Sequence, residues 1–300
     1  MRPLWVSMAY RKGGHMTQKR RVVSDKGTAK DKTETINFDE IGITNDFMFG
    51  TVFRDKVKCK ELLQRILNIK LVEIEVVEPQ KIMKTTLIGK GIRIDIYAKD
   101  SAGNVYDIEM QTTEETDLHL RTRYYHSEMD GYQIRAGQKY FNLKQSVVIF
   151  ICTFDPFADD RSIYTFETTC KENKELVLLD KRQTYFVNIN GNREGISEDT
   201  TKLLDYFKTG QPTDSYTENI QNQVEIIRED DDWRENYMTI EMKMDQKYEQ
   251  GREIGRSEGE ISKERELITK WLQKGKTITE IAEDLDQSEE YVKSLICSQK

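Results

Sequence analysis

The chain has 300 residues, of which 37% are hydrophobic and 33% charged, and its formal net charge is −7. This length allows one core of roughly 150–200 residues with smaller appendages. No run approaches the roughly 20 apolar residues that a membrane-spanning helix needs. The first residues also lack the charged-then-apolar pattern of a secretory signal. We therefore predict a cytoplasmic protein with no membrane partner.

The cysteines and histidines argue against a zinc site. There are only three histidines, and the four cysteines are far apart and form no CxxC pair. Widely spaced cysteines in a chain without an export signal favour reduced, buried thiols. The cysteines are Cys59, Cys152, Cys170 and Cys297.

Positive charge is concentrated at the start of the chain. Residues 1–32 contain nine Lys or Arg against two Asp, so the remainder is strongly acidic. We predict a disordered basic arm over residues 1–40, with contact to nucleic acid phosphates as the alternative. Translation from Met16 would shorten this arm. The acidic remainder excludes broad non-specific coating of DNA, so any contact with nucleic acid has to be local.

The first part of the chain predicts one helix followed by three strands. Apolar residues at helical spacing indicate a helix over 44–68, with Thr44 or Asn45 as its cap. Alternation predicts a strand over 70–78, which Pro79 should end. Two further alternating strands in "GIRIDIYAKDSAGNVYDIEMQ" (91–111) flank a tight turn at Gly103.

The next segments complete an α/β pattern. We predict a helix over 117–143, interrupted near Gly131. The apolar run "SVVIFICTF" (146–154) indicates a strand buried on both faces. "IYTFETTC" and "QTYFVNIN" indicate two more strands. This order predicts a core over 41–196, built as a mixed sheet flanked by helices.

The composition changes after residue 196. A helix should end at Gly210, and a long charged helix should follow over 217–248, within a helical connector that covers 197–265. Three glycines at every fourth position would share one helix face, where they either admit a close helix partner or loosen the connector. They are Gly251, Gly255 and Gly259.

Acidic and amide side chains recur on the two strands of the 91–111 stretch. Side chains alternate between the faces of a strand, so Asp95 lies opposite the isoleucine face of the first strand. In the second strand Glu109 and Gln111 lie opposite Ile108 and Met110. If the apolar faces both point to the core, the two carboxylates become neighbours, and such a pair suits Mg²⁺. A solvated face paired with Arg93 is the alternative. The isoleucines are Ile92, Ile94 and Ile96, and Arg93, Tyr97 and Asp107 share the polar faces.

A set of stretches in this order resembles a known family. "NDFMFG", "CKELLQRIL", "GIRIDIYAKD", "VYDIEMQ", "RTRYYHSEM" and "VVIFICTFDPF" are similar to the recombination-promoting nuclease / putative transposase family, which is built on the PD-(D/E)XK nuclease core. The resemblance implies a restriction-endonuclease-like fold and a Mg²⁺-dependent DNA endonuclease that promotes recombination, with Mn²⁺ as an alternative ion. It also implies that Asp95 and Glu109 are metal ligands and that the Met110 carbonyl is a third.

Gln111 departs from the superfamily pattern. It stands where the resemblance places a catalytic lysine, and an amide cannot supply a positive charge. A second metal ion or a nearby cation would have to replace that charge. The alternative function is a catalytically degenerate nuclease fold that serves as a nucleic-acid or protein binding module.

The helix after these strands carries four candidates for phosphate binding. Spacing of three residues puts Arg123 and His126 on one side of it, and packing is the alternative role. Asp46 and Glu61 are candidates for an extra acidic ligand, although Asp46 also suits a helix N-terminus. The four phosphate-binding candidates are Arg121, Arg123, Tyr124 and His126.

The last segment, 266–300, has the apolar rhythm of a helix-turn-helix, with Ser288 as a cap. It looks like the small units of sigma factors and repressors. Residues 277–297 hold six acidic residues against Lys293 alone, whereas a recognition helix offers basic or amide groups. We therefore expect these helices to dimerise or to bind a protein partner, with DNA contact as the alternative.

Overall fold

A six-stranded mixed sheet organises the chain. The computed structural model describes residues 38–84 and 91–297, so nearly all of the predicted basic arm lies outside the described residues. The strand order is β1-β2-β3-β4-β6-β5; β3, β4 and β6 pair in parallel and the other pairs are antiparallel. The predicted mixed sheet is thus confirmed. The strands are β1 (Ile74–Met83), β2 (Ile92–Asp100), β3 (Val105–Gln111), β4 (Ser146–Cys152), β5 (Ile163–Phe166) and β6 (Arg182–Asn188).

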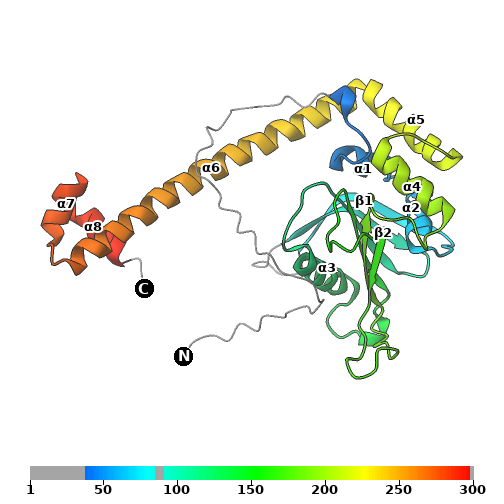
Figure 1. Ribbon diagram of the computed structural model, residues 1–300, viewed down its shortest axis with the longest axis horizontal. Coiled ribbons are helices and arrows are strands. Elements are labelled where there is room, and N and C mark those ends of the chain that lie inside the picture. Colours follow the sequence, from blue (N-terminus) through cyan, green and yellow to red (C-terminus); the bar gives the residue numbers. More distant parts are fainter. Residues whose placement is uncertain (1–37, 85–90, 298–300) are drawn as a thin grey trace, which may run out of the picture. The chain divides into compact units, whose positions relative to one another are not determined.

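Helices cover both faces of this sheet, as Figure 1 shows. One face packs against α3, and the other packs against α1, α2, α4 and α5, so two separate apolar clusters form. All seven residues of β4 are buried, because both of its faces are covered, as the apolar run predicted. The helices are α1 (Asp46–Val52), α2 (Lys56–Leu67), α3 (Leu118–Gln133), α4 (Glu198–Thr209) and α5 (Ser215–Glu229); 3₁₀ turns lie at η1 (Phe38–Glu40) and η2 (Tyr140–Asn142).

The single helix predicted over 44–68 is wrong, because the chain breaks it into α1 and α2. Asn45 caps α1, with its Oδ1 accepting from the Phe47 N–H at 3.0 Å. The Asp55 carboxylate accepts from the N–H groups of Val57 and Lys58 and so begins α2. Local side-chain acceptors therefore override a continuous apolar period.

The prediction that Pro79 ends the first strand is also wrong. β1 runs through Pro79, which lies opposite Ile96 of β2. β1 is an edge strand, so its outer side has no neighbouring strand to bond with. A proline, which lacks the N–H, is tolerated in such a strand. The next residue, Gln80, has φ of +54° and breaks the regular pairing.

The interruption predicted near Gly131 does not occur. α3 continues through this exposed glycine to Gln133, and Ile134 then takes an extended conformation. A glycine costs about 1 kcal/mol in a helix relative to alanine, which a packed helix tolerates.

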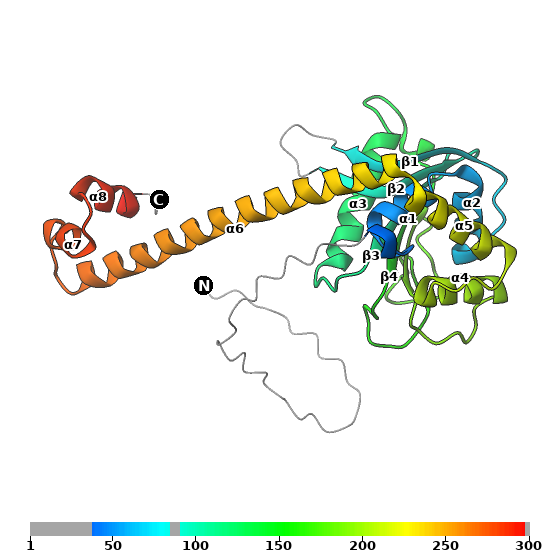
Figure 2. The same cartoon turned by 90° about the horizontal axis from the view of Figure 1, so that it is seen from above.

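From Glu198 onward, the described residues form helices joined by short connections and no strand. The predicted end of α4 at Gly210 is confirmed. Asp230 separates α5 from α6 (Asp231–Gln273), a 43-residue helix that the sequence did not predict at this length. The junction of α5 and α6 lies beside α1, as Figure 2 shows. The three spaced glycines are exposed in α6 with open space beside them, so they face no helix partner in the described chain.

Two short helices, α7 (Ile278–Leu285) and α8 (Glu289–Cys297), pack against the end of α6. Their small apolar cluster includes Ile268, Ile281 and Val292. The Ser288 hydroxyl accepts from the Tyr291 N–H at 3.1 Å, as a cap should. A helix-turn-helix function and homo-oligomerisation through these helices stay predictions. Among the described helices, none has a stretch long and apolar enough to cross a bilayer.

Gly191 tests how tightly the loops around β6 are packed. A Cβ atom there would lie 2.3 Å from the Arg161 carbonyl oxygen, where neighbouring residue Asn192 pairs with Arg161. We expect Gly191→Ala to lower the free energy of unfolding by roughly 1–3 kcal/mol or more, because backbone has to move. Gly42→Ala is the matched control, since its Cβ would meet nothing within 4 Å. Equal thermal unfolding midpoints for the two variants would contradict the tight crossing.

Candidate active site

The two strands that carry the predicted carboxylates part from each other at those residues. The ladder between β2 and β3 runs from Lys99 opposite Val105 to Ile96 opposite Ile108. Past that point, the Asp95 N–H donates to Glu109 Oε1 at 3.0 Å, and the Met110 N–H donates to Asp95 Oδ2 at 3.2 Å. Side-chain carboxylates therefore take the backbone donors that a regular ladder would pair.

Asp95 also marks a change of face in β2. Ile92 and Ile94 pack in the cluster under α3, whereas Ile96 packs in the cluster on the other face. The prediction that the three isoleucines share one face is therefore wrong. Opposite this point, Gln80 takes its left-handed conformation and donates from Nε2 toward Asp95 Oδ1 over a long 3.4 Å. The irregularity directs the Asp95 carboxylate toward β3 and β1 together.

The polar face of β3 is buried under α3. Asp107, Glu109 and Gln111 are all buried, so the alternative of a solvated face does not describe them. Asp107 is fully buried and interacts with the neighbouring Glu109 side chain. Burial, followed by the charge of Glu109, raises the pKa of Asp107 well above its usual range.

Arg121 of α3 brings a positive charge to Glu109 and Gln111. Its Nη2 lies 3.4 Å from Glu109 Oε2, and its Nη1 donates to Gln111 Oε1 at 3.2 Å. Glu115 and Tyr125 also accept from this guanidinium, at 2.7 and 3.0 Å. The Gln111 amide in turn donates to the Thr113 carbonyl at 2.9 Å, so both of its polar atoms are held.

Burial and crowding of negative charge raise the pKa values of the central carboxyls. Burial, then the charge of Asp46, raises the pKa of Asp95 to about 6. Burial, then the charge of Asp95, raises the pKa of Glu109 to about 8. Arg121 opposes both shifts without cancelling them. The single guanidinium therefore does not balance the negative charge of the centre, and a bound cation would relieve the remainder.

The donor chemistry of this centre fits a hard divalent ion. Asp95 and Glu109 offer carboxylate oxygens from neighbouring strands, and such ions prefer oxygen ligands. Within residues 38–84 and 91–297, however, no three His, Cys, Asp or Glu side chains are grouped closely enough to hold an ion. Asp95 and Glu109 would have to exchange some of their present amide and guanidinium partners to bind one.

The other predicted phosphate-binding residues do not gather at the carboxylates. Arg123 is exposed and lines a small cavity of about 270 Å³ with Arg182. Tyr124 is half-buried and packs at the edge of the cluster under α3. His126 is buried, and its ring nitrogens contact the hydroxyls of Ser146 at 2.7 Å and Thr184 at 3.0 Å. Of the four, the structure brings only Arg121 to the acidic centre.

Of the two candidates for an extra acidic ligand, Asp46 and Glu61, only one lies near the acidic centre. Asp46, the first residue of α1, lies close enough to Asp95 to raise the pKa of that carboxyl. Glu61 instead pairs with Arg65 of α2 at 2.9 Å, an arginine that also binds Asp214. Asp46 therefore belongs to the acidic centre by proximity.

The sequence pattern assigns no role to two residues of the centre. Alternation puts Asp107 on the polar face of its strand, two residues from Glu109, but gives it no function. Gln80 follows the proline that was expected to end its strand, so no pattern pointed to its contact with Asp95. Only the pairing of β1 with β2 brings it there.

His126 gives a testable pH dependence of stability. Burial, then the charge of Arg182, lowers the pKa of His126 from 6.5 to about 3. The unfolded chain therefore binds a proton near pH 6.5 that the folded protein does not, and stability should fall as the pH drops from 6.5 toward 3. In His126→Asn this contribution is absent. Denaturant unfolding should show the stability advantage of the wild type shrinking as the pH drops, whereas parallel pH profiles would contradict it.

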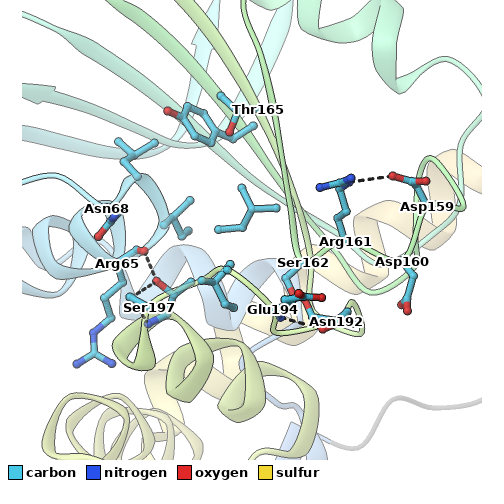
Figure 3. A pocket seen from close by; sticks show the side chains of 17 residues that line it. Arg65, Asn68, Asp159, Asp160, Arg161, Ser162, Thr165, Asn192, Glu194 and Ser197 are labelled. Atoms are coloured by element: carbon cyan, nitrogen blue, oxygen red, sulfur yellow. Dashed lines mark hydrogen bonds and ion pairs between the residues drawn. The ribbon is translucent and has the colours of Figure 1, made fainter.

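Two larger cavities lie in the described part of the chain. One, of about 780 Å³, is lined by Arg65, Asp160 and Ser197 among others, and Figure 3 shows two further lining residues, Arg161 and Asp159, paired with each other. It contains no residue of the acidic centre. The other, of about 820 Å³, is lined by Asp46 and Gln80, so it adjoins that centre.

Comparison with known proteins finds one family match. Over residues 43–254, more than half of the chain, the sequence matches the family described as PD-(D/E)XK nuclease family transposase. No curated protein and no solved structure matches the chain. The matched range contains the whole sheet and the acidic centre, and it ends inside α6.

Proposed function

The chain belongs to the PD-(D/E)XK nuclease family of transposases, and from this premise we propose that it is a Mg²⁺-dependent DNA endonuclease whose cuts promote recombination. Family membership implies a nuclease-related activity on nucleic acid. One observation carries the finer proposal: Asp95 and Glu109 lie side by side where their two strands diverge. Glu109 accepts from the Asp95 N–H, and Asp95 accepts from the Met110 N–H.

Asp95 and Glu109 would hold the divalent ion, with the Met110 carbonyl as a further oxygen ligand. When bound, Mg²⁺ or Mn²⁺ would polarise the phosphodiester and lower the pKa of an attacking water. The raised pKa values of both carboxyls support this role, because two buried carboxylates without a cation hold their protons more tightly.

Arg121 supplies the positive charge that a lysine at position 111 would provide and that Gln111 cannot. The guanidinium is always protonated and reaches both Gln111 and Glu109, so it puts a fixed positive charge where the superfamily has an ammonium. Its fork of N–H donors also matches the oxygens of a phosphate. Gln111 then acts as a positioning residue. Its amide nitrogen donates to the Thr113 carbonyl, which holds the side chain in place, and its amide oxygen accepts from Arg121.

Cutting of supercoiled plasmid by the purified chain tests the proposed function. We expect nicked or linear DNA with Mg²⁺ and none with EDTA. Asp95→Asn should reduce the rate by at least about a hundredfold, because it removes a ligand charge. Asparagine is preferred to alanine here, since its Oδ1 can still accept from the Met110 N–H and so preserve the strand fork.

Glu78→Gln is the matched control, because it removes one carboxylate from exposed β1, where Glu78 pairs with Lys81. It should cut like the wild type. Metal-dependent cutting that persists unchanged in Asp95→Asn would contradict the proposal. No cutting by folded wild-type protein with either Mg²⁺ or Mn²⁺ would favour the degenerate nuclease fold acting as a binding module.

A further inference from the structure

The cavity beside the acidic centre has a size suited to a ligand. Its volume is about 820 Å³, within the range of roughly 300–1,000 Å³ that small-molecule sites occupy. It lies between α1, β1, β2 and the first turns of α6. Asp46 and Gln80 belong to both the cavity and the surroundings of Asp95. A molecule bound at the carboxylates could therefore extend into the cavity without leaving the protein surface.

One wall of the cavity is aromatic. Trp233 is half-buried and packs edge-on against Phe47, with ring centroids 5.8 Å apart. This contact fixes the indole in place while leaving part of it accessible. Tyr237 is buried next to it, and the side chains of Asn45 and Glu241 interact with its hydroxyl. The wall thus offers a flat apolar surface with polar groups at its edge.

Cationic groups border this aromatic wall. The Arg54 guanidinium lies 5.8 Å from the Trp233 ring centroid, and both Arg54 and Arg93 are exposed. Arg54 and Arg93 line the cavity together with the acidic residues Asp46 and Glu241. An aromatic platform next to guanidinium groups is the combination that holds a base by stacking and its phosphate by charge.

Gly50 leaves room on the cavity's inner side. It lies within α1, and a Cβ atom there would stand 3.9 Å from Pro79 Cβ and 4.0 Å from Gln80 Nε2. These are ordinary contacts, so alanine fits the backbone but narrows the cavity on the side of the carboxylates.

We propose that this cavity receives an unpaired nucleobase of the strand that is cut at the Asp95–Glu109 centre, with Trp233 as its stacking platform. The inference rests on the proposed function and narrows its substrate to nucleic acid with unpaired or extrudable bases, because a stacked base inside a duplex cannot enter a concave site. An apolar peptide suits the site less well, since it would leave the two guanidinium groups and the adjoining carboxylates without partners.

Binding of two strands with equal charge tests this inference. The first is a labelled strand of about twelve thymidines, and the second has the same phosphates on abasic sugars. Because every position of each strand is identical, the register in which a strand binds does not matter. Affinity is measured by fluorescence anisotropy with the full chain carrying Asp95→Asn, in Mg²⁺, to prevent cutting. We expect the thymidine strand to bind roughly five- to hundredfold more tightly, the ratio that stacking on an aromatic side chain provides.

Three variants locate that preference. Trp233→Leu should remove it while leaving affinity for the abasic strand unchanged, and Gly50→Ala should reduce it without disturbing the fold. Tyr248→Leu is the matched control, because Tyr248 is a 71% exposed aromatic residue of α6 outside the cavity. If Trp233→Leu fails to fold, Gly50→Ala decides.

Equal affinity for the two strands, or a preference that both cavity variants retain, would overturn the inference. If metal-dependent plasmid cutting by the wild type persists alongside that result, the nuclease proposal stands and only the base site is lost. If neither strand binds and no plasmid is cut, both proposals fail.

Discussion

Two hydrogen bonds between carboxylates and backbone amides hold the centre of this protein together. Where β2 and β3 part, Asp95 accepts from the Met110 N–H and Glu109 accepts from the Asp95 N–H. Without them, two buried donors would lose their partners, at a cost of about 1–3 kcal/mol each. The same bonds fix the two carboxylates next to each other. Strand divergence and the acidic centre are therefore one structural feature.

The burial of this acidic centre sets its electrostatics. β3 continues to pair with β4 along its whole length, while α3 covers the face that carries Asp107, Glu109 and Gln111. Charge removed from water has to be neutralised by a proton, a cation or a fixed positive group. Arg121 supplies a fixed positive group from α3, and burial keeps the pKa values of Asp95 and Glu109 raised in its presence. The proposed binding of a divalent cation and the proposed role of Arg121 in place of a lysine both rest on this imbalance of charge.

Much of the sheet follows from the sequence, because strand periodicity and buried apolar runs are local signals. The placement of Glu109 and Gln111 on one face, and the double burial of β4, are examples. The failures come where a side chain or a sheet edge overrides the local pattern. Asp55 splits a helix by capping, and Pro79 stays in a strand because that strand is at the edge.

The candidate site was predictable only in part for a similar reason. Alternation could pair Asp95 with Glu109, but it could not show the change of face in β2, which lies beside the left-handed Gln80 of a neighbouring strand. Nothing near Gln111 in the sequence identifies the cation that contacts it. Arg121 and Arg123 are the same residue type two positions apart. Only the orientation of α3 on the sheet turns Arg121 toward Gln111 and leaves Arg123 exposed. Contacts between elements thus decide which charged residue joins the centre.

Moving the positive charge between the two positions tests the central claim, that Arg121 replaces the lysine expected at Gln111. Plasmid cutting would be compared in Arg121→Gln and in the double variant Arg121→Gln/Gln111→Lys, with thermal unfolding to verify the fold. The account predicts a loss of about a hundredfold or more in the single variant, the scale of removing one charge-stabilising group. It also predicts that a substantial part of the activity returns in the double variant. Wild-type cutting by Arg121→Gln, or a double variant no more active than the single one, would contradict it.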